Sequence, residues 1–375
     1  MIEADLQQAA ELAGVPLFGI ASPGQPQHYE NYVRWIQAGH HAEMSYLARQ
    51  DAIWKRENPA HILTDVKSIL LFGFPYPKSS ERIHSSHSDP VGMVSSYAQG
   101  ADYHDIIPSF LKEFVKYIES RLGKPFSFRI YTDTGPILER DWGQSSGLGW
   151  IGKNTCLISP QIGSFFFLAE VLTDLPLTPT PAFSNDFCGI CQRCIEACPT
   201  QCISTESRTI NAQRCISYLT IENRGIIPPE LRSKLATSVF GCDICQSVCP
   251  WNNKTPSHNP FPPLKTTDHP VIDLHSVVHY SEDQFRKEFA GSPILRAKRT
   301  GLLRNIVCVL GNKKNPESIP HLIQVLENEK DTVIRIHTAW ALAQYPDLMV
   351  QKALKDALST EKDTAVRKEM IAGLK

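Results

Sequence analysis

The sequence lacks any long hydrophobic run. Its longest apolar stretch, around Phe165 to Leu172, is much shorter than the about 20 residues that a membrane-spanning helix needs. The first residues, Met1 to Ala13, have the pattern of an amphipathic helix and not that of a signal peptide. We therefore expect a cytoplasmic protein that does not bind membranes.

A strong net charge is also missing. The 375 residues include 38 Lys and Arg and 39 Asp and Glu, which gives a formal net charge of -1 at pH 7. This balance excludes a protein that coats nucleic acid through bulk positive charge, but it leaves room for a local basic face. The chain is long enough for two or three domains, each with its own core.

Cysteine, in contrast, is plentiful. The chain has 11 cysteines, and most of them lie between Cys188 and Cys249. In a small secreted domain such a number would indicate disulfides, but here the clustering and the absence of a signal peptide pattern indicate metal ligation.

Two cysteine motifs account for most of this cluster. The first is the bacterial ferredoxin run, which ends in Pro199 and comprises Cys188, Cys191, Cys194 and Cys198. The second has the same pattern without its first cysteine and comprises Cys242, Cys245 and Cys249. In ferredoxins the last cysteine of each motif binds the other motif's [4Fe-4S] cluster. Crossed ligation therefore predicts a complete set of Cys188, Cys191, Cys194 and Cys249, and an incomplete set of Cys198, Cys242 and Cys245.

The incomplete set needs a fourth ligand. Cys215 lies between the two motifs and can supply it, whereas Cys202 follows Cys198 by only four residues and is more constrained. We assign Cys215 and keep Cys202 as the alternative. Zinc would favour two separated cysteine pairs around one ion, which a run of four cysteines fits poorly. Cys156 and Cys308 lie in apolar runs and are predicted to be buried small hydrophobic residues.

The rest of the chain predicts a multidomain α+β protein. We expect an α/β domain over residues 1–174, a ferredoxin-like domain over 175–254, a proline-rich linker over 255–290 and HEAT-like helical repeats over 291–375. The repeats are indicated by similar apolar segments around three arginines spaced for paired helices, Arg304, Arg335 and Arg367.

Three local elements in the first domain are predicted from periodicity. Ser109 to Leu122 carries an apolar stripe typical of a helix, with Gly123 as its terminating residue. Phe126 to Tyr131 alternates like a strand. The apolar runs Thr155 to Ser159 and Ser164 to Leu172 are predicted to form a hairpin.

One glycine-rich segment matches a nucleotide-binding pattern by accident. Gly147 to Gly152 resembles the dinucleotide fingerprint, and its extension to Asn154 nearly matches a P-loop. Both mechanisms need a strand before the glycines and a helix after them, because the helix N-terminus binds the phosphate. The flanking sequence predicts neither element, so we exclude a nucleotide site here.

Several motifs together resemble one enzyme family. They are Tyr97-x5-Tyr103-His104, the segments Asp133 to Arg140 and Gly147 to Asn154, the two cysteine motifs and the repeat tail. This combination resembles the epoxyqueuosine reductases over nearly the whole chain. The resemblance implies an enzyme that uses cobalamin to reduce epoxyqueuosine to queuosine at the wobble position of tRNA. Its partners would be that tRNA and an external low-potential electron donor, and we expect a monomer.

The corrinoid follows only from the resemblance. Related reductive dehalogenases share it, and a motif Asp-x-His-x-x-Gly would place histidine on the cobalt. Here Asp102-x-His104 is followed by Ile107 where glycine is required. We therefore expect cobalamin without a histidine ligand, and His104 either lines the substrate side of the pocket or is a core histidine. The other implied cobalamin contacts are Arg56, Tyr97, Lys153, Asn154, Ser217 and Asp243.

Asp133 is the predicted catalytic acid. Epoxide reduction with loss of oxygen as water consumes two electrons and two protons, so a positioned acid is needed beside the electron supply. A buried carboxyl near a corrinoid could donate a proton near neutral pH. The alternative is a turn or helix-cap aspartate ahead of Pro136.

RNA binding is expected from the repeat domain and the nearby loops. The predicted phosphate contacts are Arg224, Lys298, Arg299 and Arg304. An ordinary charged helix surface is the alternative, and Arg335 and Arg367 could instead join repeat helices. A corrinoid-dependent dehalogenase and a non-catalytic electron carrier remain the other candidate functions.

Overall fold

The computed structural model describes residues 2–78, 90–254, 260–264 and 268–374. It divides the chain into two compact units. Unit 1 comprises residues 1–78, 100–213 and 243–267, and unit 2 comprises 79–99, 214–242 and 268–375. The stretch 175–254, predicted as one ferredoxin-like domain, contributes to both units.

Unit 1 is built around a four-stranded sheet with the order β1-β2-β7-β4. All three strand pairs are antiparallel. The strands are β1 (Leu17–Ala21), β2 (Ser68–Pro75), β7 (Phe166–Thr173) and β4 (Phe128–Tyr131). Every residue of β2 is buried, because helices cover both faces of this central strand.

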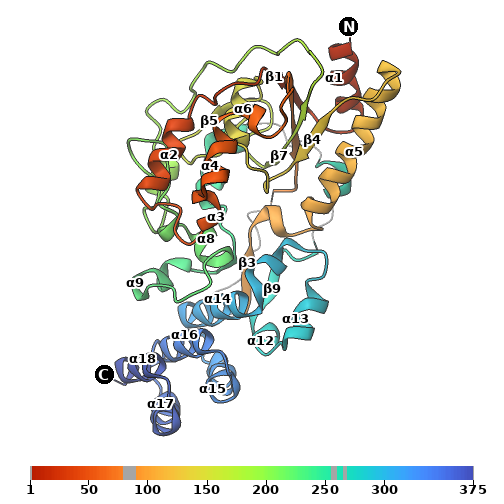
Figure 1. Cartoon of the computed structure of the whole chain (residues 1–375). Helices are drawn as coiled ribbons and strands as arrows, with labels where there is room; N and C mark the ends of the chain where they lie inside the picture. Colours follow the sequence, from red (N-terminus) through yellow and green to blue (C-terminus); the bar gives the residue numbers. More distant parts are fainter. Residues whose placement is uncertain (1, 79–89, 255–259, 265–267, 375) are drawn as a thin grey trace. The chain divides into compact units, whose positions relative to one another are not determined.

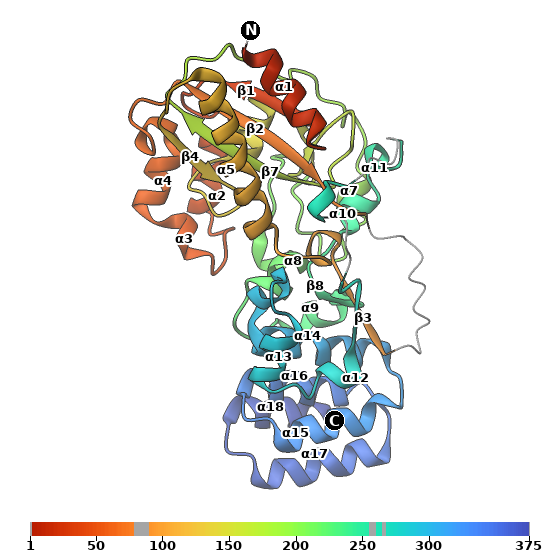
Figure 2. The ribbon, with the colours of Figure 1, turned by 90° about the vertical axis from the view of Figure 1, so that its right-hand side faces the viewer.

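Helices α1 (Ile2–Leu12) and α5 (Tyr103–Leu122) lie against one face of the sheet (Figure 2). Aromatic rings fill this layer; Phe114 of α5, for example, meets Phe72 of β2 edge-on at 5.2 Å between ring centroids. On the other face, helix α6 (Glu139–Ser145) packs against β7 and contributes Trp142 to an apolar cluster. Other helices of the unit are α2 (Tyr29–Gln37), α3 (Ser45–Ala48), α4 (Gln50–Glu57), α7 (Arg193–Glu196), α10 (Ile244–Ser247) and α11 (Pro250–Lys254).

Helix α5 confirms and extends the predicted helix. It ends at Gly123, which adopts the left-handed conformation with a φ of 68°. It begins at Tyr103 because the Asp102 side chain accepts a hydrogen bond from the backbone N–H of His104. The cap therefore places His104 in the first turn of a long helix.

The predicted hairpin is only partly correct. An antiparallel bridge between Ser159 and Gly163 forms its turn. However, β6 (Leu157–Ile158) pairs with β5 (Trp150–Ile151), whereas β7 pairs with β2 and β4. The glycine-rich segment thus contains a strand and follows helix α6, so it has neither the preceding strand nor the following helix that the two nucleotide-binding motifs require.

Unit 2 combines a small sheet with the helical repeats. Its strand order is β8-β3-β9, with β8 (Ser238–Phe240), β3 (Val91–Val94) and β9 (Val271–Asp273). Helices α8 (Ile216–Ile221), α9 (Pro229–Arg232), α12 (Leu274–Val277) and α13 (Glu282–Glu288) accompany the sheet. Part of the predicted linker, over 271–288, is therefore regular structure, while 255–259 and 265–267 lie outside the described residues.

The repeats form two layers of helices (Figure 1). One layer contains α14 (Lys298–Lys313), α16 (Thr332–Leu342) and α18 (Thr364–Gly373), and the other contains α15 (Ser318–Asn328) and α17 (Leu348–Thr360). Asp331 and Asp363 cap α16 and α18 in the same way, each accepting two backbone N–H groups. This periodicity confirms the predicted helical repeats. No helix in the described ranges is both long and apolar enough to cross a bilayer.

The repeated arginines are structural. Arg335 forms an ion pair with Glu361 at 3.4 Å, and Arg367 donates to the carbonyl oxygens of Leu358 and Glu361. The prediction that Arg304 contacts RNA is wrong, because its side chain is 0% exposed. Its guanidinium donates to the carbonyl oxygens of Leu219, Asn223 and Gly225. Buried charge of this kind is tolerated only because it is fully hydrogen-bonded.

Candidate active site and cluster sites

Asp133 lies in a turn that follows β4. Thr132 anchors the start of this turn, because its Oγ1 donates to the Leu168 carbonyl oxygen of β7 at 2.9 Å. Asp133 itself has a φ of 59°, in the left-handed region that residues other than glycine seldom occupy. It does not cap α6, whose N-cap is Leu138. Such strained positions gather at functional sites, which favours a catalytic role over the helix-cap alternative.

Two side chains from the first turn of α5 converge on the Asp133 carboxyl. The Tyr103 hydroxyl donates to Asp133 Oδ2 at 3.0 Å, and His104 Nε2 lies 3.3 Å from the same oxygen. The other ring nitrogen of His104, Nδ1, lies 2.7 Å from Asp102 Oδ1. The Tyr103 ring stacks between His104 and Phe167, with centroids 4.0 Å from each. The sheet and α5 together fix this group.

The two carboxyls beside His104 favour its protonated form. Burial alone lowers its pKa, but the hydrogen bonds to Asp102 and Asp133 outweigh burial and raise the pKa to about 9. Both ring nitrogens are engaged by carboxylates, so neither is available to bind a metal. This geometry supports the expectation that His104 is not a cobalt ligand, and it places His104 beside the candidate acid.

The raised pKa of His104 predicts a pH-dependent stability. The folded state holds this proton up to about pH 9, whereas the unfolded chain releases it near 6.5. The stabilisation is therefore complete below pH 6.5 and is lost as the pH rises through 9. With allowance for solvent screening we expect about 1–2 kcal/mol. H104Q should flatten the fall of the melting temperature between pH 6.5 and 9. H61Q is the control: it changes a histidine that stacks on Trp54, and it should leave the fall of the melting temperature unchanged. Parallel curves of melting temperature against pH for wild type and H104Q would contradict the raised pKa of His104.

Arg56 forms a hydrogen bond to the backbone of the Asp133 turn. Its guanidinium, which is buried, donates to the carbonyl oxygens of Ala52 and Gly135, each at 3.2 Å. Glycine is favoured at position 135, because a Cβ atom there would clash with the Tyr131 ring at a distance of 2.6 Å. Arg56, predicted as a cofactor contact, thus positions the loop that carries Asp133.

The four cysteines of the predicted complete set line one cavity of about 50 Å³. They are Cys188, Cys191, Cys194 and Cys249. In the described part of the chain, no three His, Cys, Asp or Glu side chains converge closely enough to bind a single metal ion. Thiols that surround a cavity fit a multi-iron cluster better than a tetrahedral zinc ion, whose ligands must lie about 2.3 Å from one point.

Lys153 and Asn154 organise the loops around this cavity. Lys153 Nζ donates to the carbonyl oxygens of Gly189 at 2.8 Å and Cys191 at 2.9 Å. Asn154 Nδ2 donates to the Cys245 carbonyl oxygen at 3.3 Å. Both residues were predicted from the resemblance as cofactor contacts, and in this structure they support the cysteine loops. Asp243 is the N-cap residue of α10, the helix that contains Cys245.

An aromatic shell around the cavity was not predicted. Trp150 Nε1 donates to Cys188 Sγ at 3.4 Å, and the Trp150 ring contacts Phe183, Phe187 and Trp251. Hydrogen bonds to sulfur and exclusion of solvent both tune the potential of a cluster. In the sequence, this shell is indicated only by Trp150 within the Gly147 to Asn154 motif and by Trp251 directly after Pro250.

The incomplete cysteine set is distributed over the two units. Cys198 and Cys245 belong to unit 1, and Cys215 and Cys242 belong to unit 2. Within unit 1, Cys198 Sγ lies 3.5 Å from Cys202 Sγ, so Cys202 remains a real alternative to Cys215. Of the cysteines predicted not to be ligands, Cys308 is fully buried as expected and Cys156 is half-buried.

The remaining predicted residues lie in unit 2. Tyr97 packs on Phe240 with ring centroids 6.2 Å apart, and Ser217 lies in α8. Arg299 donates hydrogen bonds to the Tyr280 carbonyl oxygen and the Glu329 carboxylate, so its guanidinium is paired within unit 2. Arg224 and Lys298 are exposed and stay candidates for phosphate contacts.

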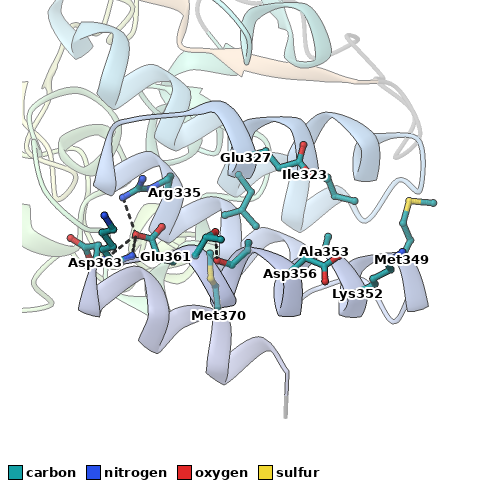
Figure 3. A pocket seen from close by; sticks show the side chains of 14 residues that line it. Ile323, Glu327, Arg335, Met349, Lys352, Ala353, Asp356, Glu361, Asp363 and Met370 are labelled. Atoms are coloured by element: carbon teal, nitrogen blue, oxygen red, sulfur yellow. Dashed lines mark hydrogen bonds and ion pairs between the residues drawn. The ribbon is translucent and has the colours of Figure 1, made fainter.

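Another cavity, of about 950 Å³, lies among α15, α16, α17 and α18 (Figure 3). Arg335, Glu361 and Met370 are among its lining residues. None of the predicted catalytic, cofactor or cluster residues lines it, so it adds nothing to the candidate active site.

Comparison with known proteins decides the family. A model described as epoxyqueuosine reductase QueG matches residues 56–134, a 4Fe-4S double cluster binding domain matches 187–252, and HEAT repeats match 293–375. The epoxyqueuosine reductase of Pseudomonas aeruginosa is 36% identical over 337 residues, which cover 88% of this chain and 91% of the relative. The chain belongs to the epoxyqueuosine reductase family.

Solved structures of epoxyqueuosine reductases share the whole fold. One with a tRNA-Tyr epoxyqueuosine-modified stem loop has a TM-score of 0.90 at 27% identity and covers 100% of this chain and 98% of its own. Another, from Bacillus subtilis, has its catalytic aspartate loop swung out of the active site and a TM-score of 0.89 at 27% identity, with the same coverage. The multidomain α+β class, the double-cluster domain and the repeats are thereby confirmed.

Proposed function

We propose that this chain reduces epoxyqueuosine in tRNA to queuosine. Its membership of the epoxyqueuosine reductase family supports this function, and the observation that carries it is the Tyr103, His104 and Asp133 group in a chain that also has a double-cluster domain. Reduction breaks the two C–O bonds of the epoxide, takes up two electrons and two protons, and releases the oxygen as water. A site for this reaction needs a positioned acid and a low-potential electron supply.

Asp133 is proposed as the acid. In its protonated form the carboxyl gives a proton to the epoxide oxygen, while the Tyr103 hydroxyl holds Oδ2. The protonated His104, 3.3 Å from that oxygen, can then return a proton to Asp133. Because the two groups are so close, they titrate as a pair, and the acid of the reaction is best described as the Asp133–His104 pair.

The two clusters are proposed as the electron supply. We assign Cys188, Cys191, Cys194 and Cys249 to one [4Fe-4S] cluster, and Cys198, Cys215, Cys242 and Cys245 to the other. The cavity lined by the first four thiols supports the first assignment. An external low-potential donor would reduce the clusters, and we propose that the protein acts as a cytoplasmic monomer.

Cobalamin is the proposed cofactor of the α/β part of unit 1. When bound, it would supply a low-potential cobalt centre for the electron transfer. Both nitrogens of His104 are engaged, so cobalamin would bind without this histidine as a ligand. We retain Tyr97, Ser217 and Asp243 as proposed contacts, whereas Arg56, Lys153 and Asn154 already bind carbonyl oxygens and would shape the loops around the cofactor.

An anaerobic titration tests the cofactor assignment. The reconstituted protein should shift the visible spectrum of added cobalamin to that of a form without an axial base, and H104A should give the same shift. A spectrum that retains an axial nitrogen in wild type and loses it in H104A would contradict the assignment. No shift at all, with iron content intact, would exclude cobalamin.

RNA binding is proposed for the exposed cations of unit 2. Phosphate contacts by Lys and Arg position an RNA without reading its sequence. We expect K298E to raise the KM for tRNA by about 3- to 10-fold with little change in kcat, and to lower the salt slope of binding by about 1. K355E, on the exposed face of α17, is the matched control. Equal KM values for K298E and wild type would remove Lys298 from the interface.

The main alternative is a reductive dehalogenase of small organohalides. The helical repeats argue against it, because a small substrate does not need an extended helical surface. Turnover of an organohalide but not of epoxyqueuosine tRNA would favour the alternative.

A further inference from the structure

An apolar surface lies at the rim of the predicted cluster cavity in unit 1. Ile190, between Cys188 and Cys191, is 100% exposed. Phe187, directly before Cys188, is 44% exposed and lines the cavity. Single exposed apolar side chains are common on proteins, but these two lie on the loop that carries two of the predicted cluster ligands. Their position calls for a functional explanation.

Phe187 also contacts the aromatic shell of the cavity. Its ring stacks on Trp251 with centroids 5.4 Å apart, and Trp251 meets Trp150 edge-on at 5.1 Å. Trp150 Nε1 in turn donates to Cys188 Sγ at 3.4 Å. A molecule that covers Phe187 and Ile190 would therefore be separated from the thiols by a single layer of side chains.

Cations lie beside this apolar surface. Lys153 and Arg193 line the cavity, and none of its described lining residues is acidic. Arg193 is exposed, so its charge is accessible to a partner as well as to a cluster. Lys78 Nζ donates at 3.0 Å to Asn253 Oδ1, on the short helix α11 that also carries Trp251. The rim of the cavity therefore combines apolar side chains with positive charge.

Two acidic side chains, Asp186 and Glu196, lie on the same stretch of chain. Asp186 forms an ion pair with Arg208, so its charge is offset. Glu196 is exposed in α7 and acts against the cations. With Asp186 paired, the positive charge of Lys153 and Arg193 exceeds the negative charge of Glu196. This balance favours a partner with an acidic surface.

We propose that Phe187, Ile190 and Arg193 form the docking surface for the external electron carrier, and that this carrier is a small acidic ferredoxin. The inference rests on the proposed function, which requires a low-potential donor. Each reduced ferredoxin gives one electron to the cluster of the complete cysteine set and leaves oxidised, so two ferredoxins supply the two electrons for one epoxide. Electron-transfer complexes have small interfaces, so two apolar side chains with a cationic rim are sufficient.

Opposite charges at one position test this surface. I190D places a negative charge on it, and I190K places a positive charge at the same site. Because the Ile190 side chain is 100% exposed, both variants should retain the iron content of wild type. I371D, at an isoleucine of α18 that is 45% exposed, is the control.

The first readout is the affinity of oxidised ferredoxin for the reconstituted protein, measured by calorimetry without tRNA or reductant. I190D should weaken binding about 10-fold, whereas I190K should stay within about 3-fold of wild type and I371D should match it. Added salt should weaken the binding of wild type, because it screens the opposite charges. Equal affinity of I190D and wild type would overturn the proposal, as would the lack of ferredoxin binding by wild type. Equal weakening by I190D and I190K would exclude an acidic partner.

The second readout is the rate at which the cluster absorbance bleaches in stopped flow, again without tRNA. With sub-saturating reduced ferredoxin, I190D should bleach about 10-fold more slowly than wild type, whereas with reduced methyl viologen the two rates should agree. Equal loss of rate with both reductants would overturn the proposal, because Ile190 would then act on the cluster and not on the carrier. If wild type accepts electrons through this surface but does not convert epoxyqueuosine, the proposed function fails while the docking surface stands.

Discussion

Replacement of Asp133 with asparagine should abolish turnover while leaving the iron clusters in place. Asparagine has the same shape and can still accept hydrogen bonds from Tyr103 and His104, so the turn should keep its conformation. It cannot give up a proton as a carboxylic acid does. General acid catalysis is worth about 10²- to 10⁴-fold, and we expect a loss in that range in single-turnover rate.

The matched control for this variant is D105N. Asp105 lies on the exposed side of the first turn of α5, close in sequence to His104 but outside the hydrogen-bonded group. D105N should keep wild-type activity. Near-normal turnover by D133N, with iron and cobalamin bound in wild-type amounts, would remove Asp133 from the chemistry and leave His104 as the acid.

Replacement of Cys215 with serine should remove one cluster of the two. Two [4Fe-4S] clusters require about eight iron atoms per chain, so C215S should retain about four and lose nearly all turnover. C202S, whose thiol lies 3.5 Å from Cys198 Sγ, should keep about eight iron atoms and most of the activity. Iron and sulfide analysis after anaerobic reconstitution measures this directly.

The opposite result would decide the open question on the fourth ligand. If C202S loses half of the iron and C215S does not, Cys202 completes the second set. If neither variant loses iron, a group other than a cysteine provides the fourth ligand.

The sequence alone predicts those features that depend on local spacing. The cysteine run, the apolar stripe of α5 with Gly123 at its end, and the 31- and 32-residue intervals between Arg304, Arg335 and Arg367 all follow from neighbours in the chain. Their structural consequences are confirmed by the left-handed Gly123, the cavity lined by four cysteines and the stacked repeat helices. The family also follows, because it depends on motifs that can be compared residue by residue.

Features that depend on tertiary packing could not be predicted in this way. The run Ser164 to Leu172 is equally apolar whether it pairs with β6 or with β2, and only the sheet determines the choice. Arg304 looks like a surface cation in sequence, yet it is buried because carbonyl oxygens from three distant residues surround it. Nothing in a single sequence marks Glu170 as buried, although it is 0% exposed in the middle of β7.

The arrangement around Asp133 combines both kinds of feature. Asp133 was predicted from its motif, and His104 from its place in a half-complete corrinoid motif. Only the structure shows that the two side chains are within hydrogen-bond distance, and that the other ring nitrogen of His104 contacts Asp102. This contact supports the proposal that His104 lines the active site and supplies protons to Asp133.

The most direct test of the account is the nucleoside composition of tRNA after reaction. Epoxyqueuosine-containing tRNA would be incubated anaerobically with the reconstituted, cobalamin-loaded protein and a low-potential reductant, digested, and analysed by mass spectrometry. We predict conversion of epoxyqueuosine into queuosine, with the loss of one oxygen atom, in wild type and in D105N but not in D133N. Unchanged epoxyqueuosine with the wild-type protein, when both clusters and cobalamin are bound, would contradict the account.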